Sequence, residues 1–183
     1  MKRLSIIIGA AIALGVLVII FVGMYKFNFR NDDIILSPTP PVSIKDTTYV
    51  IDHRAVTLIG GIATERLADS SASMTTKYFG NEVEGDFNND GQADTAFLLT
   101  QDSGGTGTFY YLVVALKQGS GYQGTNAILL GDRIAPQTTG YMNNLIVVNY
   151  ADRKPIEPMT AIPTVGISRY FSINGTVLTE VSK

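Results

Sequence analysis

The chain has 183 residues, contains no cysteine and carries a formal net charge of −2. The lack of cysteine excludes disulfides, thiol nucleophiles and zinc–thiolate sites. Residues 1–30 hold four Lys and Arg and no acid, which leaves 10 Lys and Arg against 16 Asp and Glu in the rest, a net charge of −6. This mildly acidic remainder has room for one ordinary domain and lacks the basic face of a nucleic-acid-binding protein.

An uncharged and mainly apolar run of 20 residues occupies positions 4–23. As a helix it would extend about 30 Å, the thickness of a hydrocarbon core. A cleaved signal peptide is the alternative, but the run exceeds the usual apolar core of about 7–15 residues and no small-x-small cleavage site follows it. Aromatic and basic residues alternate at positions 25–30, as at a membrane interface. The sequence therefore predicts a single-pass anchor over residues 1–30.

The orientation of this anchor follows from its short basic N-terminus, which usually stays in the cytoplasm. The remainder of the chain would then be extracytoplasmic, in the periplasm or at the cell surface. Residues 31–48 contain three prolines and no apolar periodicity, so they predict a semi-extended linker between the anchor and a domain at residues 49–183.

From residue 49 onward, short apolar segments alternate with Gly, Asn, Asp and Ser, a pattern typical of β-strands. A short helical turn is expected at Gly60–Asp69, and Asn174-Gly175 is expected to supply two positive-φ residues to a tight hairpin. The fold class predicted is mainly β, a single antiparallel β-sandwich or meander domain after the N-terminal transmembrane helix. The expected strands are residues 49–51, 55–59, 95–101, 108–117, 125–130, 144–150, 165–173 and 176–181.

The sharpest chemical signal is the stretch GDFNNDGQAD at residues 85–94. Its oxygen-bearing side chains alternate along the loop, and the glycine at position 91 permits a sharp turn, which is the spacing of a calcium loop. An EF-hand would continue with a Glu at position 12, where this chain has Phe97 in an apolar strand, so the loop is not an EF-hand. A metal-free Asn/Asp/Gly turn is the alternative. The sequence predicts Ca²⁺ in loop 86–94, with ligands from Asp86, Asn88, Asp90, Gln92 (by its carbonyl) and Asp94.

The remaining calcium ligands would come from water or from neighbours such as Glu82 or Glu84. The order of this loop and the apolar strand after it resembles the calcium loops of FG-GAP and VCBS-type repeats, in which D-x-N-x-D-G-x-x-D precedes such a strand. Those families use several copies to build a propeller. This chain has one copy, so a propeller does not follow.

A longer part of the chain, about residues 49–173, resembles an uncharacterised family of bacterial envelope proteins. The segments that carry this resemblance include YFGNE at 78–82, GTFYYLVVAL at 107–116 and IVVNYADRKPIEPM at 146–159. The resemblance implies a bacterial source and an extracytoplasmic setting. It implies no activity.

Outside the loop, charged residues have ordinary structural interpretations. His53 is the only histidine, so two-histidine metal centres are absent, and its place predicts an exposed turn. Asp132-Arg133 and Asp152-Arg153 follow strands and are expected to form ion pairs that fix loops, although they could also line a polar site.

Together these features predict a membrane-anchored, calcium-binding extracytoplasmic β-domain with a structural or partner-binding role in the bacterial envelope. Its partner would be an unknown protein or a glycan, and no catalytic residue is assigned. One alternative is an envelope-associated hydrolase that uses acids such as Glu82, Asp132 or Asp152, although the sequence shows no converging pair of carboxylates outside the loop. A component of a larger envelope assembly, docked through the membrane helix, is a further alternative.

Overall fold

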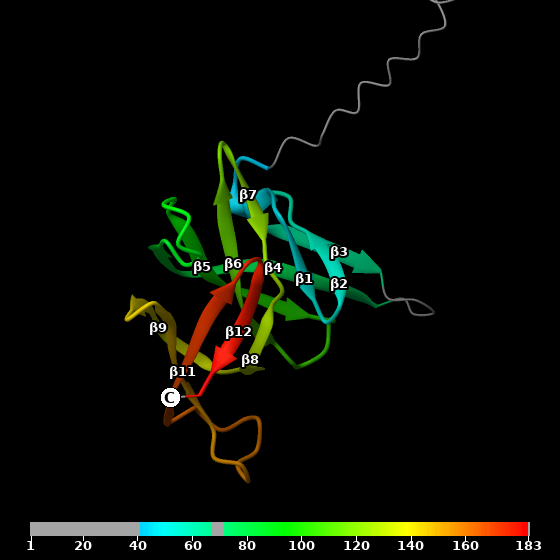
Figure 1. The fold of residues 1–183 in the computed structure, drawn as a ribbon. Helices are drawn as coiled ribbons and strands as arrows, with labels where there is room; N and C mark the ends of the chain where they lie inside the picture. The colour runs from blue at the N-terminus through cyan, green and yellow to red at the C-terminus, as the bar shows by residue number, and fades with distance from the viewer. Residues whose placement is uncertain (1–40, 67–71, 183) are drawn as a thin grey trace, which may run out of the picture. The chain divides into compact units, whose positions relative to one another are not determined.

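The computed structural model describes residues 41–66 and 72–182 (Figure 1). Within them the chain forms antiparallel β-sheets and one short 3-10 helix, η1 (Ile44–Asp46), so the predicted mainly β class is confirmed. None of the helical structure in these two ranges is long and apolar enough to cross a membrane. The anchor predicted over residues 1–30 lies outside the described residues.

The strands form two large sheets and one hairpin. The hairpin consists of β1 (Thr48–Ile51) and β2 (Arg54–Thr57). The six-stranded sheet has the order β3 (Ile62–Arg66), β4 (Ser73–Gly85), β5 (Asp94–Asp102), β6 (Phe109–Gln118) and β7 (Gly121–Gly124), and β8 (Ile128–Asp132) also pairs with β6. The four-stranded sheet has the order β12 (Val177–Val181), β11 (Val165–Asn174), β10 (Leu145–Asp152) and β9 (Ala135–Met142).

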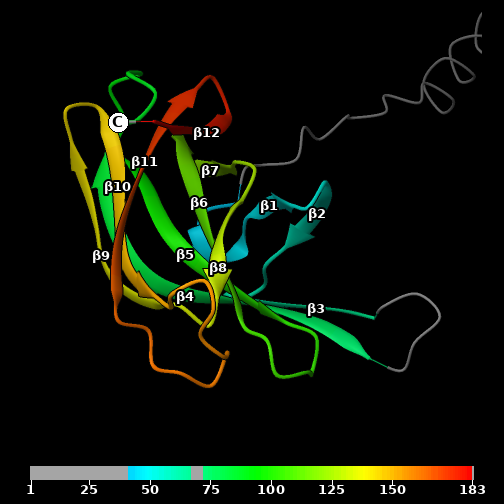
Figure 2. The same ribbon diagram turned by 90° about the horizontal axis from the view of Figure 1, so that it is seen from below.

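Strands β5 and β6 form the central layer, with a hydrophobic core on each face. Leu98 and Leu112 belong to the core shared with the four-stranded sheet, whereas Phe97 and Val113 belong to the core under the β1–β2 hairpin. Figure 2 shows this hairpin and strands β9–β11 on opposite sides of β5 and β6. Burial on both faces explains why these two strands read as almost continuous apolar runs.

The expected strands that start at residues 49, 55, 95, 108, 144, 165 and 176 are present with shifts at their ends, and the expected strand 125–130 appears as β8. Four strands were not predicted. Three of them are β4, β7 and β9, and the fourth is β3, which occupies residues 62–66 where a helical turn was expected. The prediction of a helical turn is therefore wrong for residues 60–66, the part of it that the structure describes.

The longest strand, β4, escaped prediction because its pattern is interrupted. Gly80 and Asn81 have φ values of 106° and 57°, and the register with β5 shifts on both sides of Gly80. These bulges add residues to one strand and break the alternation that marks a strand in the sequence. The hairpin before β12 also differs from its prediction. Gly175 has a φ of 61°, but Asn174 is the last residue of β11 and pairs with Val177.

Residues 41–48, predicted as the end of the linker, contact the sheets. The Pro41 carbonyl accepts a hydrogen bond from the Tyr122 amide at 2.9 Å, and the Lys45 carbonyl accepts one from the Gly61 amide at 2.7 Å. Thr47 is buried. The described part of the folded unit therefore begins at residue 41.

Candidate metal centre

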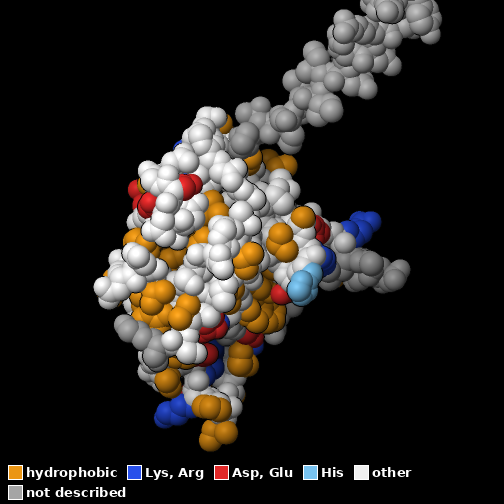
Figure 3. Space-filling view, in the orientation of Figure 1, with side chains coloured by type: hydrophobic (Ala, Val, Ile, Leu, Met, Phe, Trp, Pro, Cys, Tyr) orange, Lys and Arg blue, Asp and Glu red, His pale blue; other side chains and the backbone are white. Residues whose placement is uncertain are grey.

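The acidic loop (residues 86–94) connects β4 to β5 and is closed at its base, where Gly85 pairs with Asp94. It lies at the upper left of Figure 1, and Figure 3 shows acidic side chains gathered at the same place. Asn89 and Gly91 have φ values of 61° and 83°, and these two left-handed residues turn the chain sharply. The local sequence thus folds into the tight loop that its Asn, Asp and Gly content predicts.

Three side chains of the loop fold back onto its own backbone amides. The Asp86 carboxylate accepts hydrogen bonds from the amides of Asp90 and Gly91 at 3.0 and 2.9 Å. The Asn88 side-chain oxygen accepts from the same Asp90 amide at 3.0 Å, and the Asp90 carboxylate accepts from the Gln92 amide at 2.8 Å. Side-chain oxygens at positions 1, 3 and 5 are therefore held around one short stretch of backbone.

Asp94 has a different position. It is fully buried, and its two carboxylate oxygens accept hydrogen bonds from the amides of Phe87, at 3.0 Å, and Lys117, at 2.8 Å. Burial raises the pKa of Asp94 above its usual value, and the nearby charges of Asp90 and Asp86 add to this increase, while the two amide hydrogen bonds oppose it. Asp94 therefore joins the acidic loop to β6 from the inside.

Gln92 also connects the loop to the sheet. Its side-chain oxygen accepts a hydrogen bond from the Gly119 amide, in the turn after β6, at 3.1 Å. This contact uses the side chain of Gln92. The sequence assigns the other oxygen of this residue, its backbone carbonyl, to a metal.

The charge of the acidic loop is not balanced by a basic side chain. Within residues 41–66 and 72–182, no ion pair joins Asp86, Asp90 or Asp94 to a lysine or arginine. The Lys117 ammonium lies over the Tyr122 ring instead, 4.3 Å from its centroid. The donors to these acids are backbone amides and the Asn88 side-chain amide, which donates to Asp90 at 3.0 Å.

The donor set of the loop fits a hard cation such as Ca²⁺, which takes carboxylate, amide and carbonyl oxygens. Each carboxylate has about four lone-pair sites, so the amide hydrogen bonds leave Asp86 and Asp90 able to coordinate. The described residues contain no group of three or more His, Cys, Asp or Glu side chains that could hold a metal ion. Asp94 is turned to the amides of Phe87 and Lys117, so the other predicted donors of the loop are two acids, the Asn88 side chain and the Gln92 carbonyl.

The acidic loop also contacts the four-stranded sheet. The Tyr141 hydroxyl donates a hydrogen bond to the Asp86 carbonyl at 2.9 Å, and the Phe87 and Tyr141 rings pack edge to face with centroids 4.8 Å apart. A side chain at position 85 would lie 2.7 Å from the Tyr141 ring, so glycine is required there. The sequence did not single out Tyr141, because a contact across 55 residues leaves no local signal.

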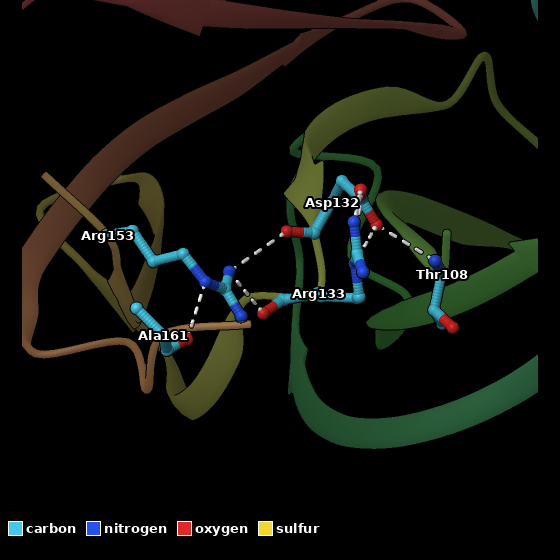
Figure 4. Close-up of polar contacts among 5 residues, drawn as sticks. All are labelled: Thr108, Asp132, Arg133, Arg153 and Ala161. Carbon is cyan, nitrogen blue, oxygen red and sulfur yellow. Dashed lines mark hydrogen bonds and ion pairs between the residues drawn. The ribbon is translucent and has the colours of Figure 1, made fainter. Parts of the chain in front are cut away.

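A second polar cluster, which we call the arginine brace (Asp132, Arg133 and Arg153), lies where β8 and β10 end (Figure 4). Asp132 forms the predicted ion pair with Arg133 at 3.0 Å and also accepts from the Thr108 amide at 2.9 Å. The Arg153 guanidinium donates to the carbonyls of Ala161 at 2.7 Å and Arg133 at 2.9 Å. The brace therefore ties the β8–β9 and β10–β11 connections together.

The predicted ion pair between Asp152 and Arg153 is wrong. The Asp152 carboxylate accepts a hydrogen bond from the backbone amide of Arg153 at 2.7 Å, because the guanidinium is occupied by carbonyls. Glu82, a predicted supplementary metal ligand, accepts a hydrogen bond from the Tyr78 hydroxyl. Burial and this contact raise the pKa of Tyr78 to about 12. His53 is exposed in the β1–β2 turn, as expected.

Comparison with known proteins adds no family to this picture. No protein-family model matches the chain, and neither a curated protein nor a solved structure matches it. The resemblance to FG-GAP and VCBS-type loops and to bacterial envelope proteins therefore stays a prediction from the sequence.

Proposed function

We propose that this protein is a membrane-tethered binding domain whose acidic loop holds a structural Ca²⁺. The observation that carries the proposal is the unbalanced charge of the loop. Asp86 accepts from the amides of Asp90 and Gly91 and Asp90 accepts from the next amide, that of Gln92, so both carboxylates lie along one short stretch of backbone. Asp94 lies close enough to both for their charges to raise its pKa. No described basic side chain pairs with them, so a divalent cation supplies the missing positive charge.

In this proposal Asp86, Asn88 and Asp90 coordinate the ion with their side chains, and Gln92 does so with its carbonyl. Asp94 positions the loop, because its oxygens hold the amides of Phe87 and Lys117. The motif also predicts that Asp94 coordinates the ion. It would do so with the carboxylate lone pairs that these two amides leave. Water completes the shell. A site without a bidentate Glu is expected to bind in the range of about 10⁻⁴–10⁻³ M, as in extracellular modules.

The role of the ion would be to stabilise a junction of the fold. The Asp86 carbonyl receives the Tyr141 hydroxyl of β9, and Phe87 packs against the same ring and is buried in the core between the two large sheets. An ion that fixes Asp86 therefore also fixes the contact between β4 and β9. Ligands that bind only the folded state stabilise it by mass action.

The remaining parts of the proposal concern location. The apolar run at residues 4–23 would anchor the chain in a membrane, and the residues before position 41 would link it to the extracytoplasmic domain, as in the envelope proteins that the sequence resembles. The partner would be a protein or a glycan of the bacterial envelope. The hydrolase alternative is not favoured, since Asp132 and Glu82 are engaged by Arg133 and Tyr78.

Calorimetric titration of Ca²⁺ into the full-length chain in detergent tests the site. We expect one ion per chain with weak affinity, and loss of the binding heat in Asp86→Asn. Asp132→Asn is the matched control, because it makes the same change at an acid that pairs with Arg133 outside the loop. Equal binding by all three proteins, or no heat at millimolar Ca²⁺, would refute the site.

A further inference from the structure

The connection between β10 and β11 (residues 153–164) exposes large apolar side chains. Among residues 41–66 and 72–182, Ile156 and Ile162 are the two most exposed large apolar side chains, at 95% and 80%, and Met159 is 41% exposed. We call these three side chains the apolar tip. The connection forms the lower end of the domain in Figure 1, and Figure 3 shows hydrophobic side chains protruding at the same end.

Hydrogen bonds fix the shape of this connection. The Glu157 amide donates to the Lys154 carbonyl at 3.0 Å, and the Ala161 amide donates to the Pro158 carbonyl at 2.8 Å, so two successive turns close on themselves. The Arg153 guanidinium holds the Ala161 carbonyl from the side of the brace. The apolar tip is therefore presented by a preorganised loop, which loses little conformational entropy when it binds.

The polar groups beside the apolar tip have partners within the connection. The Glu157 carboxylate accepts a hydrogen bond from the Lys154 amide at 2.9 Å and lies 3.9 Å from the Lys154 ammonium. Positions 155, 158 and 163 are prolines, which have no backbone N–H to satisfy. Paired polar groups lower the cost of moving this segment into an apolar medium, whereas a protein interface draws on free donors and acceptors.

The anchor predicted from the sequence would keep a bilayer within reach of the apolar tip. From residue 30, the end of that anchor, to residue 41 the chain has 11 steps (41 − 30), which extend at most about 36–40 Å. A compact domain of this size is about 37 Å across. Either end of the domain can therefore reach the membrane, and the tether makes insertion of the tip an intramolecular event, so that weak insertion suffices.

We propose that the apolar tip inserts into the bilayer that holds the anchor of the same chain. The three side chains would enter the boundary between headgroups and acyl chains to a depth of about 5–10 Å. The Lys154 side chain, 66% exposed, can extend back to the lipid phosphates. The charges of Lys154 and Glu157 cancel, so insertion needs no anionic lipid. This inference rests on the membrane tether proposed above and is independent of calcium.

A single tryptophan can test the position of the tip, because the chain contains none. The full-length Ile156→Trp variant is reconstituted in phosphatidylcholine vesicles with brominated acyl chains, since bromine quenches tryptophan fluorescence on contact. Ile59→Trp is the matched control, because Ile59 is an equally large side chain, 79% exposed, in the connection between β2 and β3.

In Ile156→Trp the brominated vesicles should lower the emission at least about twofold relative to ordinary vesicles, as expected for a side chain at the edge of the acyl region. The emission should also move to shorter wavelength, equally at low and high salt. Ile59→Trp should show neither change.

Two results would overturn the inference. The first is unquenched emission of Ile156→Trp in brominated vesicles. The second is a shift to shorter wavelength that is the same in both kinds of vesicle and grows with protein density, which would assign the tip to a second copy of the chain. Flotation of the vesicles after an alkaline wash tests the tether separately. A chain that floats without quenching removes only the insertion, and a chain that does not float removes the tether and the insertion together.

Discussion

The acidic loop and the arginine brace are both polar connections between strands, but they balance their charges differently. In the brace, Asp132 pairs with Arg133. The Arg153 guanidinium donates to one carbonyl of the β8–β9 connection and one of the β10–β11 connection. In the acidic loop the acids receive only neutral amide donors. The protein thus carries its own cations at the brace, whereas no described basic side chain pairs with the acids of the loop, and we propose that an external cation does so.

The largest effect is expected where the acidic loop joins β6. Asp94→Ala would leave the buried amide of Phe87 and the amide of Lys117 without acceptors, and we expect a loss of about 3 kcal/mol in the free energy of unfolding. Urea denaturation in chelator measures it. Asp90→Ala, on the exposed side of the same loop, is the control and should lose less than about 1 kcal/mol. Similar losses for both would show that Asp94 does not anchor the loop.

A change in the brace should cause the next largest loss in the free energy of unfolding, and this loss should be independent of calcium. Arg153→Ala removes the donors to the carbonyls of Ala161 and Arg133, which predicts a loss of about 2 kcal/mol. Lys154→Ala is the neighbouring control, since its side chain is 66% exposed. Denaturation curves with calcium and with chelator should give the same loss, and a loss that appears only in one of them would contradict the separation of the two clusters.

A matched pair of Asp→Asn changes compares the clusters directly. Asp132→Asn breaks the ion pair with Arg133 and should lower the free energy of unfolding by about 1 kcal/mol. Asp90→Asn removes one of several like charges and should raise it by up to about 0.5 kcal/mol in chelator. Thermal melts of both variants show whether each change raises or lowers the stability of the folded state. Destabilisation by Asp90→Asn without metal would mean that repulsion in the loop is already relieved.

The sequence predicted the parts of the fold in which local pattern and environment agree. The apolar runs of β5 and β6 are buried on both faces, and the loop at 86–94 has the Asn, Asp and Gly residues that its turn requires. Strand β4 was missed because Gly80 and Asn81 interrupt its alternation. Strand β9 was missed because most of its residues are small or polar and none of them is fully buried.

The candidate site was predicted in its composition but not in its connections. The spacing of the motif placed Asp86, Asn88 and Asp90 together, and their hydrogen bonds agree with this. The burial of Asp94 against β6 and the hydrogen bond from Arg153 to the Arg133 carbonyl depend on residues 20 or more positions away in the chain. Such contacts are set by tertiary packing and leave no trace in local sequence.

The most direct test of the dependence on an external cation is a thermal melt of the full-length chain with calcium and with chelator. At ten to a hundred times the dissociation constant, binding should stabilise the folded state by about 1.4–2.7 kcal/mol. For a domain of this size the melting temperature should rise by about 4–8 °C. The same rise in Asp132→Asn and its absence in Asp86→Asn would support the proposed site. Identical melting temperatures of the native chain in about 10 mM calcium, ten times the weakest dissociation constant expected, and in chelator would contradict it.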